Sequence, residues 1–409
     1  MPAALVLLEG GIVAVIAAKI YQVSPFTISL ITAAPMFANL SSFLWNVLSA
    51  GKAKVVFANV LQICSILCLL MVAISPINET GVFILVSSMI VSRVLVSGLV
   101  TVRSVIWSLN YHRGNRAKAT SRLQMIASLM TVLVSSSIGP FLDANPEEFI
   151  WVYVIGALVG LIGTVFFSRV KVVDEKKQLN DEVIAKSDKH KATGFVEIIR
   201  QDRFFRRYQY SMFTAGFGNM LIEAPLVFLV TRELQASYTM SIMITMLIPF
   251  AVSLVALPLW ALYLDRVHVA QFRARQSILW VLAQALTLVG ASLGSFTWLM
   301  IGRFIMGVAR GGGTLAWQLG HNDFAKPDQL SAYMGIHVTL TVVRGAIAPF
   351  LGMALYSGIP TLSWDSIGSN IFLVAAVVSG CAGIGFYRFF TTLRKANLTN
   401  IETRISDDP

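Results

Sequence analysis

A lone carboxylate stands in the first apolar segment of each half of the chain. Glu223 lies near the middle of its segment, between Gly218 and Pro225, and Glu9 is followed directly by Gly10. A charge near the centre of a bilayer costs about 2.5–3.5 kcal/mol on insertion scales, so it needs a partner, a wet cavity or a function. Burial favours the protonated form of a carboxyl group, and interrupted helices form ion sites in transporters. The pattern predicts proton carriers at Glu223 and Glu9; a structural carboxylate bonded to a neighbouring helix is the alternative.

Basic side chains also lie inside apolar segments. Arg344 is deep in its segment with His337 two turns earlier, while Arg93, Arg303 and Arg310 belong to two other segments. An arginine can pair with a carboxylate or hold an anionic solute through a bidentate contact, and a histidine can relay protons. We therefore predict substrate-binding roles for these five residues. The alternatives are snorkelling to the membrane surface for the arginines nearer segment ends and a satisfied core histidine.

Residues near segment ends have simpler explanations. Trp107 and Trp317 fit an aromatic belt at the membrane surface, and a gating role is the second interpretation. His321, Asn322 and Asp323 follow a segment end, where helix capping and gate contacts are the commoner use. The sequence contains no Ser-His-Asp, zinc-spaced or phosphate-loop pattern. We therefore expect no enzyme activity, no metal site and no bound cofactor.

The composition places all these residues in a membrane. Hydrophobic residues make up 56% of the 409-residue chain and charged residues only 13%, whereas soluble domains carry about 25% charged residues. The apolar runs have the length of bilayer-crossing helices, not of the shorter alternating strips of membrane barrels. The net charge of +11 fits the basic bias of cytoplasmic loops better than nucleic-acid binding. Cys64, Cys68 and Cys381 lie in apolar segments and predict neither disulfides nor metal ligands.

The apolar runs predict an all-α polytopic membrane protein with about twelve transmembrane helices. In the first half the expected spans are Ala3–Ile20, Phe26–Leu48, Lys54–Ser75, Val82–Ser108, Arg122–Leu142 and Phe149–Arg169. In the second half they are Gln209–Val230, Thr239–Tyr263, Gln276–Phe296, Trp298–Leu319, Leu330–Leu355 and Ile367–Phe390.

The loop charges predict the orientation of these spans. With the N-terminus in the cytoplasm, the inward loops hold most of the Lys and Arg, and the outward loops at 75–81, 143–148 and 356–365 hold none. Lys19 and Arg232, near other outward ends, are exceptions. The bias indicates an inner (cytoplasmic) membrane protein with both termini in the cytoplasm.

A polar stretch divides the chain into domains. It covers residues 170–208 and separates a six-helix bundle at 1–169 from a second bundle at 209–392, with a cytoplasmic tail at 393–409. Near its end, apolar residues recur at helical spacing among basic ones, from Phe195 to Phe205. This spacing predicts a short amphipathic helix on the inner membrane surface, within an otherwise cytoplasmic linker.

The two bundles read as copies of one design. At an offset of about 210 residues, Arg93 and Trp107 align with Arg303 and Trp317, and Gly139–Leu142 aligns with Ala348–Leu351. Upstream, with a small slip, Glu9 lies under Glu223 and Trp45 beside Trp260. Parallel repeats are the layout of secondary transporters whose site lies between the halves. In this register the first span lacks residues that precede the seventh, so we expect a short first span or a natural start upstream of Met1.

This architecture resembles the major facilitator superfamily over essentially the whole chain. The family's loop motif Gly-x-x-x-Asp-Arg is matched by Ala261-Leu-Tyr-Leu-Asp265-Arg266, which keeps the acid and the base, whereas the first copy at Asn46–Lys52 lacks the Asp. The family's Arg and Gly in the fourth helix are matched loosely at Arg93, and more closely at Arg303 in the tenth. The resemblance implies alternating access between two bundles, with Asp265 and Arg266 at a gate.

We therefore expect a secondary transporter of a small organic solute, driven by the proton gradient and working as a monomer in the bilayer. The excess of cations over anions within the spans favours a substrate with an anionic group, for example an organic acid, a siderophore or a drug-like molecule. An uncoupled facilitator of the same fold is one alternative. A non-transporting membrane sensor or scaffold is another, which the short linker and tail disfavour.

Overall fold

A computed structural model of the protein describes residues 1–8, 10–111, 113–173, 175, 179, 195–325, 329–359, 361 and 363–396. Within these residues the regular structure is helical, apart from an isolated antiparallel bridge between Ile359 and Trp364. The predicted all-α fold is confirmed. The linker residues before 195 lie mostly outside the described part.

The helices of the first half are α1 (Pro2–Val6), α2 (Gly10–Lys19), α3 (Pro25–Leu40), α4 (Ser42–Ser49), α5 (Lys54–Ala73), α6 (Glu79–Asn110), α7 (Arg113–Ala144) and α8 (Phe149–Phe167), with a 3-10 turn η1 (Pro146–Glu148). The second half has α10 (Phe195–Gln201), α11 (Arg203–Leu221), α12 (Glu223–Phe228), α13 (Tyr238–Ile242), α14 (Ile248–Leu264), α15 (Val269–Leu293), α16 (Phe296–Leu319), α17 (Leu330–Ser357) and α18 (Asn370–Lys395), with π-helical turns η2 (Leu229–Glu233) and η3 (Met243–Leu247).

Nine stretches of the described residues are long and apolar enough to cross a membrane, by length and composition. The helix at the position of the predicted tenth span is α16, which is 24 residues long and carries Arg303 and Arg310. The first two predicted spans are each broken into shorter helices, α1 with α2 and α3 with α4. The ninth begins at Val269, earlier than the predicted Gln276.

Capping residues account for several helix starts. The Asn78 side chain accepts a hydrogen bond from the Gly81 N–H at 2.9 Å, and Ser24 accepts one from the Thr27 N–H at 3.2 Å. The Asp202 carboxylate caps α11. Such short polar side chains satisfy N–H groups that the first turn of a helix leaves without partners.

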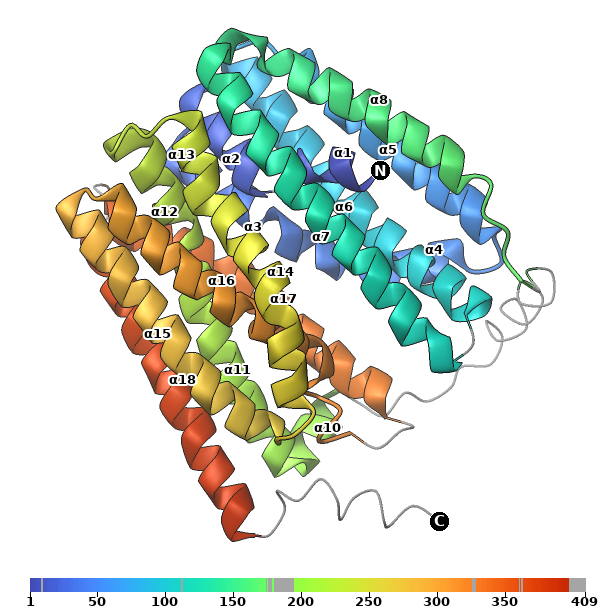
Figure 1. Cartoon of the computed structure of the whole chain (residues 1–409), viewed down its shortest axis with the longest axis vertical. Helices are drawn as coiled ribbons and strands as arrows, with labels where there is room; N and C mark the ends of the chain where they lie inside the picture. The colour runs from blue at the N-terminus through green and yellow to red at the C-terminus, as the bar shows by residue number, and fades with distance from the viewer. Residues whose placement is uncertain are drawn as a thin grey trace. The chain divides into compact units, whose positions relative to one another are not determined.

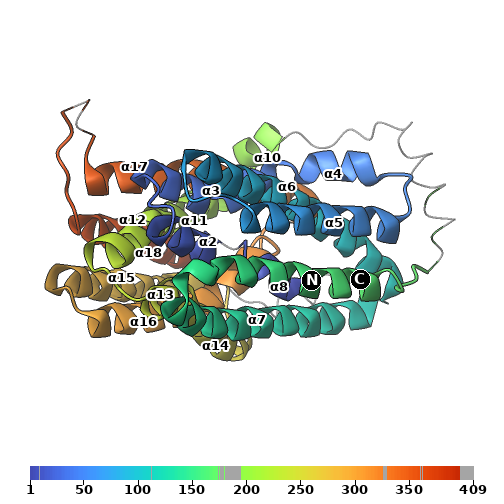
Figure 2. The same cartoon turned by 90° about the horizontal axis from the view of Figure 1, so that it is seen from above.

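The chain divides into two compact units. Unit 1 comprises Met1–Lys191 and Val230–Met246, and unit 2 comprises Ala192–Leu229 and Leu247–Pro409. In unit 1 α5 packs between α6 and α8, and in unit 2 α15 packs between α16 and α18 (Figures 1 and 2). The short α13 packs on α2 and α7 of the first half, although it belongs to the eighth span. Each unit is therefore a helix bundle with its own core.

The internal repeat has a clear structural signature in unit 1. The Trp45 indole N–H donates to the Val94 carbonyl of α6 at 2.9 Å, and its ring packs edge-on against Phe57 with centroids 6.2 Å apart. A Cβ atom on Gly98 would lie 2.6 Å from Cδ2 of Trp45. Gly98 therefore leaves the space in which the indole packs on α6.

Unit 2 repeats these three contacts. The Trp260 indole N–H donates to the Val308 carbonyl of α16 at 2.8 Å, and its ring packs edge-on against Phe272 with centroids 5.0 Å apart. A Cβ atom on Gly312 would lie 2.8 Å from Cδ2 of Trp260. The Gly311–Gly313 run is thus a surface of α16 for close helix packing.

The matching contacts fix the register of the repeat in the fourth and tenth spans. Gly98 corresponds to Gly312, an offset of about 214 residues. The offset of about 210 that the sequence suggested for these two spans is wrong, by about one helical turn. Arg93 and Arg303 are therefore not at equivalent positions, although Glu9 and Glu223 keep their correspondence.

Candidate functional site

The seventh span is interrupted at the carboxylate that the sequence singled out. α11 ends at Leu221, Ile222 forms a turn, and Glu223 is the first residue of α12. Pro225 has no N–H, so the Leu221 carbonyl lacks the donor that a continuous helix would supply. The predicted loosening of the helix around Glu223 is present.

A glycine of another helix closes on this interruption. A Cβ atom on Gly352 of α17 would overlap the Leu221 carbonyl oxygen. The backbones of α11 and α17 therefore approach as closely as glycine permits. This contact holds the broken segment against α17, just before Glu223.

Glu223 lies near enough to a buried arginine of unit 2 for their charges to interact. Its side chain is half-buried, whereas Arg303 of α16 is 1% exposed, and the two charges attract. Arg310, two turns further along α16, repels Arg303 and lies over the Phe250 ring at 4.1 Å. The structure thus brings together Glu223 and Arg303, and gives Arg310 an aromatic partner.

The first span shows the same interruption. α1 ends at Val6 and α2 begins at Gly10. Glu9 lies outside the described residues, but the carbonyl of Leu8 beside it accepts a hydrogen bond from Arg93 Nη2. Arg93 is 9% exposed. An arginine therefore interacts with a group at the helix break in each unit, by a hydrogen bond in unit 1 and by charge attraction in unit 2, and the two arginines come from different turns of corresponding spans.

A second group of buried polar residues in unit 2 surrounds Arg344. The Arg344 guanidinium donates to the Met212 carbonyl and to Thr341 Oγ1, the latter at 3.1 Å. A Cβ atom on Gly216 would overlap this guanidinium, so Gly216 admits it against α11. Arg344 is 5% exposed.

His337 lies two turns before Arg344 on α17 and is 2% exposed. Its Nδ1 is 3.0 Å from Gln209 Oε1. The Trp317 ring lies beside the imidazole, with centroids 5.4 Å apart, and the Trp317 indole N–H donates to Thr341 Oγ1 at 3.1 Å. Trp317 is therefore part of this group, a position that an aromatic belt alone does not explain.

Arg273 completes the group, although it is not among the site residues predicted from the sequence. It is 7% exposed, its Nη1 donates to Gln276 Oε1 at 2.8 Å, and it interacts with the Tyr208 hydroxyl and with Arg344. The predicted ninth span begins at Gln276, so Arg273 falls in the predicted inward loop before it. Its apolar neighbours in the sequence, Phe272 and Ala274, are the signal that could have placed it in the helix.

Arg273, His337 and Arg344, with Gln209 and Trp317, form what we call the basic cluster. Several of its polar atoms have no protein partner in the described part of the chain: Nε of Arg273 and Arg344, Nε2 of His337 and Nε2 of Gln209. Leaving such a buried group unsatisfied costs about 1–3 kcal/mol, so water or a polar solute is its natural partner. The basic cluster is thus a cationic, hydrogen-bonding region inside the bundle.

Helix ends in unit 1 form a further polar contact, at the end of α2 and the start of α13. Lys19 donates to the Ala236 carbonyl at 2.5 Å and lies over the Tyr238 ring at 4.8 Å. Arg232 donates to the Val23 carbonyl at 3.3 Å. Lys19 and Arg232, the two exceptions to the charge bias, therefore both bind backbone carbonyls.

Asp143 at the end of α7 strengthens this contact. Its carboxylate accepts hydrogen bonds from the N–H groups of Tyr238 and Thr239, at 2.5 and 3.1 Å. These N–H groups belong to the first turn of α13, where a negative charge is favourable. The end of the fifth span thus caps the eighth.

The remaining predicted gate residues lie apart from these groups. Asp265 and Arg266 are exposed at the end of α14. Trp107 is half-buried and packs against Tyr111 and Phe167. Asp323 accepts a hydrogen bond from the Val269 N–H at 2.9 Å, so it caps α15, the role that its position after a helix end suggested.

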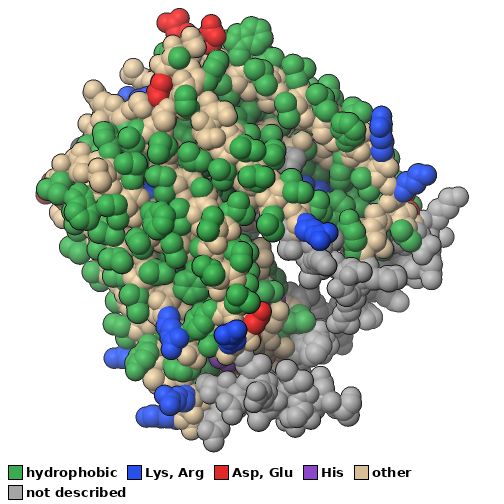
Figure 3. Space-filling model, viewed as in Figure 1, with side chains coloured by type: hydrophobic (Ala, Val, Ile, Leu, Met, Phe, Trp, Pro, Cys, Tyr) green, Lys and Arg blue, Asp and Glu red, His purple; other side chains and the backbone are tan. Residues whose placement is uncertain are grey.

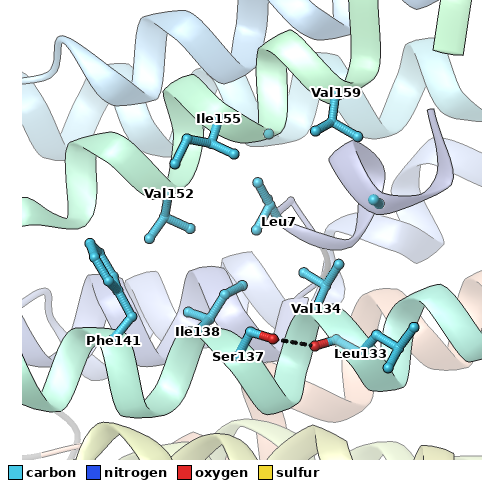
Figure 4. Close-up of a pocket in the computed structure, with 11 residues that line it drawn as sticks. Leu7, Leu133, Val134, Ser137, Ile138, Phe141, Val152, Ile155 and Val159 are labelled. Atoms are coloured by element: carbon cyan, nitrogen blue, oxygen red, sulfur yellow. Dashed lines mark hydrogen bonds between the residues drawn. The ribbon is translucent and has the colours of Figure 1, made fainter. Parts of the chain in front are cut away.

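An apolar groove of about 420 Å³ lies between α1, α7 and α8 in unit 1 (Figure 4). Leu7 points into the space between the two longer helices, toward Ile155 on one side and Val134 on the other (Figure 4). None of the residues that line it is charged, and the hydroxyl of Ser137 donates to the Leu133 carbonyl. It lacks the groups that would recognise a polar solute.

The described residues contain no group of three or more His, Cys, Asp or Glu that could hold a metal ion.

The sequence profile of the Major Facilitator Superfamily matches residues 4–282, more than half of the chain. The chain belongs to this superfamily. No curated protein sequence matches significantly.

Solved transporter structures share the fold. A mutant of the nucleoside transporter NupG has a TM-score of 0.70 and 12% identity, covering 95% of this chain and 98% of that one. A D-xylose-proton symporter has a TM-score of 0.69 and 13% identity, covering 95% and 96%. A mutant of the peptide transporter POT has a TM-score of 0.67 and 15% identity, covering 97% and 94%. At such low identity the likeness establishes the fold alone, with no indication of substrate; membership of the superfamily and the apolar helices make the protein a multi-pass membrane protein.

Proposed function

We propose that this protein is a proton-coupled secondary transporter that carries a small solute with an anionic group across the inner membrane by alternating access. The observation that carries the proposal is the Glu223 carboxylate at the interruption of the seventh span, opposite the buried Arg303. Discontinuous helices next to buried charges form ion and substrate sites in secondary transporters.

Proton coupling follows from the charge balance of this pair. Ionised Glu223 attracts Arg303, whereas protonated Glu223 leaves a buried cation without that attraction. Since the loss of this attraction destabilises the arrangement that contains it, protonation of Glu223 favours a different arrangement of groups around Arg303. Proton binding at Glu223 then biases one conformation of the transporter, and Glu9 is the corresponding carboxylate of the first half. A proton-coupled symporter among the proteins of similar fold supports this class of mechanism.

The basic cluster supports an anionic substrate. Arg273 and Arg344 lie close enough to repel each other, with His337 beside them, and their Nε atoms are without protein partners in the described residues. A carboxylate or similar group would satisfy donors of this kind through charge-assisted hydrogen bonds. We assign His337 and Arg344 to substrate recognition, with Arg273 as a further cation of the same cluster. We also propose that both termini lie in the cytoplasm and that the protein works as a monomer.

The test is uptake of a mixed metabolite extract into proteoliposomes, read by mass spectrometry with and without an imposed pH gradient. Glu223→Gln is compared with Glu233→Gln, a matched change at an exposed glutamate ten residues further along the same span. We expect some solute to accumulate only with the gradient, and only Glu223→Gln to abolish the accumulation. Equal, gradient-independent equilibration in all three proteins would identify an uncoupled facilitator and overturn the coupling.

A further inference from the structure

A groove with two chemically different ends runs between α15 and α18 on unit 2. Its volume is about 470 Å³, and only residues of these two helices line it. α15 and α18 pack together along their length and run in opposite directions (Figures 1 and 2). Both belong to spans, so the groove is a feature of the membrane-spanning part of the protein.

Two glycines of α18 create the groove. A Cβ atom on Gly383 would lie 2.9 Å from Cβ of Ser277, so the helices are in close contact there. A Cβ atom on Gly380 would meet only Val281, at 3.8 Å, which is ordinary contact with room beyond it. The absence of side chains at these positions leaves a furrow between the helices.

The lining changes from polar to apolar along the helices. Gln271 and the exposed Arg275 lie toward the start of α15, and Val281 and the exposed Ile278 lie further along it. Ten residues of helix from Gln271 to Val281 span about 15 Å. The groove is therefore amphipathic along its length, with a cation at one end and hydrocarbon at the other.

The polar end belongs to a larger basic surface. The last turns of α18, which end there, carry the exposed residues Arg388, Arg394 and Lys395, and neither α15 nor α18 contains an acidic residue. Basic side chains gather at the lower end of the molecule, over the start of α15 and the end of α18 (Figure 3). The groove of Figure 4 has no such cation, although its volume is similar.

We propose that the α15–α18 groove binds an anionic glycerophospholipid. The phosphate group lies against Arg275 at the membrane surface, with Gln271 beside it, and an acyl chain follows the apolar lining past Ile278. The order of cation and hydrocarbon matches the order of head group and chain in a lipid, and each Lys or Arg near a membrane surface adds to the attraction for anionic lipids. The site goes beyond the proposed transport function and does not depend on it.

The experiment is native mass spectrometry of the full-length protein in detergent, titrated with phosphatidylglycerol or with phosphatidylcholine of the same acyl chains. Arg275→Gln removes the cation of the groove. Its control is Arg169→Gln, since both arginines are exposed and lie over an aromatic ring, and Arg169 lies in unit 1, two residues after the end of α8. Gly380→Leu fills the apolar part, and its neighbour at 3.8 Å makes this change compatible with folding.

We expect the wild type to prefer phosphatidylglycerol by about fivefold or more, Arg275→Gln to reduce this preference about fivefold, and Arg169→Gln to preserve it. Gly380→Leu should weaken retention of both lipids, which separates chain binding from charge attraction. Equal retention of the two lipids by the wild type, or an unchanged preference in Arg275→Gln, would overturn the proposal. Undiminished binding by Gly380→Leu would also overturn it, because the acyl chain would then lie elsewhere.

Discussion

In unit 1, Arg93 reaches the break in the first span and donates to a backbone carbonyl, that of Leu8. In unit 2, Arg303 attracts the carboxylate of Glu223, the residue at the break in the seventh span. The two arginines come from different turns of corresponding helices, whereas the Trp, Phe and Gly residues that pack those helices correspond in register. The comparison teaches that the contacts which build the fold are duplicated, while the charged groups have diverged between the units.

Replacing each arginine should produce the largest difference between the two units. Arg303→Ala removes a buried cation and its attraction for the half-buried Glu223, and the cost of about 3–5 kcal/mol for losing one member of a fully buried pair is the upper bound of the expected loss. Arg93→Ala removes a charged donor from a carbonyl, for which about 1–3 kcal/mol is expected. Thermal unfolding in detergent should therefore show the larger loss for Arg303→Ala, with partial recovery in Arg303→Lys. Equal losses at both positions would show that the two halves use their arginines alike.

The packing glycines should behave symmetrically. Gly98→Ala and Gly312→Ala each force a Cβ atom against Cδ2 of a tryptophan, at 2.6 and 2.8 Å. Overpacking of this kind costs about 1–3 kcal/mol, so we expect similar falls in melting temperature for both variants. Gly380→Ala, with its nearest neighbour at 3.8 Å, is the control and should stay close to the wild type. A large difference between positions 98 and 312 would contradict the register of the repeat.

The contact of Asp143 with the start of α13 in unit 1 provides a smaller effect. Asp143→Ala removes the acceptor for the Tyr238 and Thr239 N–H groups, and loss of a helix cap costs about 1 kcal/mol. We expect faster amide hydrogen exchange in α13, measured by mass spectrometry, with α15 unchanged. Glu147→Ala, an exposed acid in the adjacent turn, is the control. Unchanged exchange in α13 would mean that Asp143 does not stabilise its first turn.

The smallest effect concerns pH. Burial lowers the pKa of His321 from its ordinary value of 6.5, so the folded protein favours the neutral imidazole and the unfolded chain takes up the proton first. His321 therefore contributes stability above pH 6.5, and this contribution is lost as the pH falls through 6.5 toward the lower folded value. Between about pH 7.5 and about pH 5 the melting temperature of His321→Gln should fall slightly less than that of the wild type. A steeper fall in the variant would reverse the sign.

The sequence was sufficient for the features that depend on composition and on single residues. Long apolar runs predicted the membrane helices, and Gly218, Glu223 and Pro225 predicted a loosened seventh span. What it could not supply depends on contacts between helices. The correspondence of Arg93 with Arg303 looked convincing, but the packing of Trp260 on Gly312 places the two arginines a turn apart.

Helix boundaries limited the prediction of the site itself. Charged residues in a membrane sequence indicate a loop, so Arg273 falls in the predicted loop before the ninth span, although α15 begins at Val269. Lys19 and Arg232 were visible only as exceptions to the charge bias. Their acceptors are the carbonyls of Ala236 and Val23, and a sequence does not show which backbone carbonyls accept hydrogen bonds from side chains.

The contact of Gly352 with the interrupted seventh span also bears on which sequences this fold admits. Since even a methyl group at this position would overlap the Leu221 carbonyl oxygen, every other amino acid requires the backbones of α11 and α17 to move apart. Position 352 is therefore closed to variation for steric reasons alone, independently of the solute that is carried. In a saturation library selected for stable insertion, it should be among the least tolerant sites of α17, whereas tolerance at Glu223 would change with the selection applied.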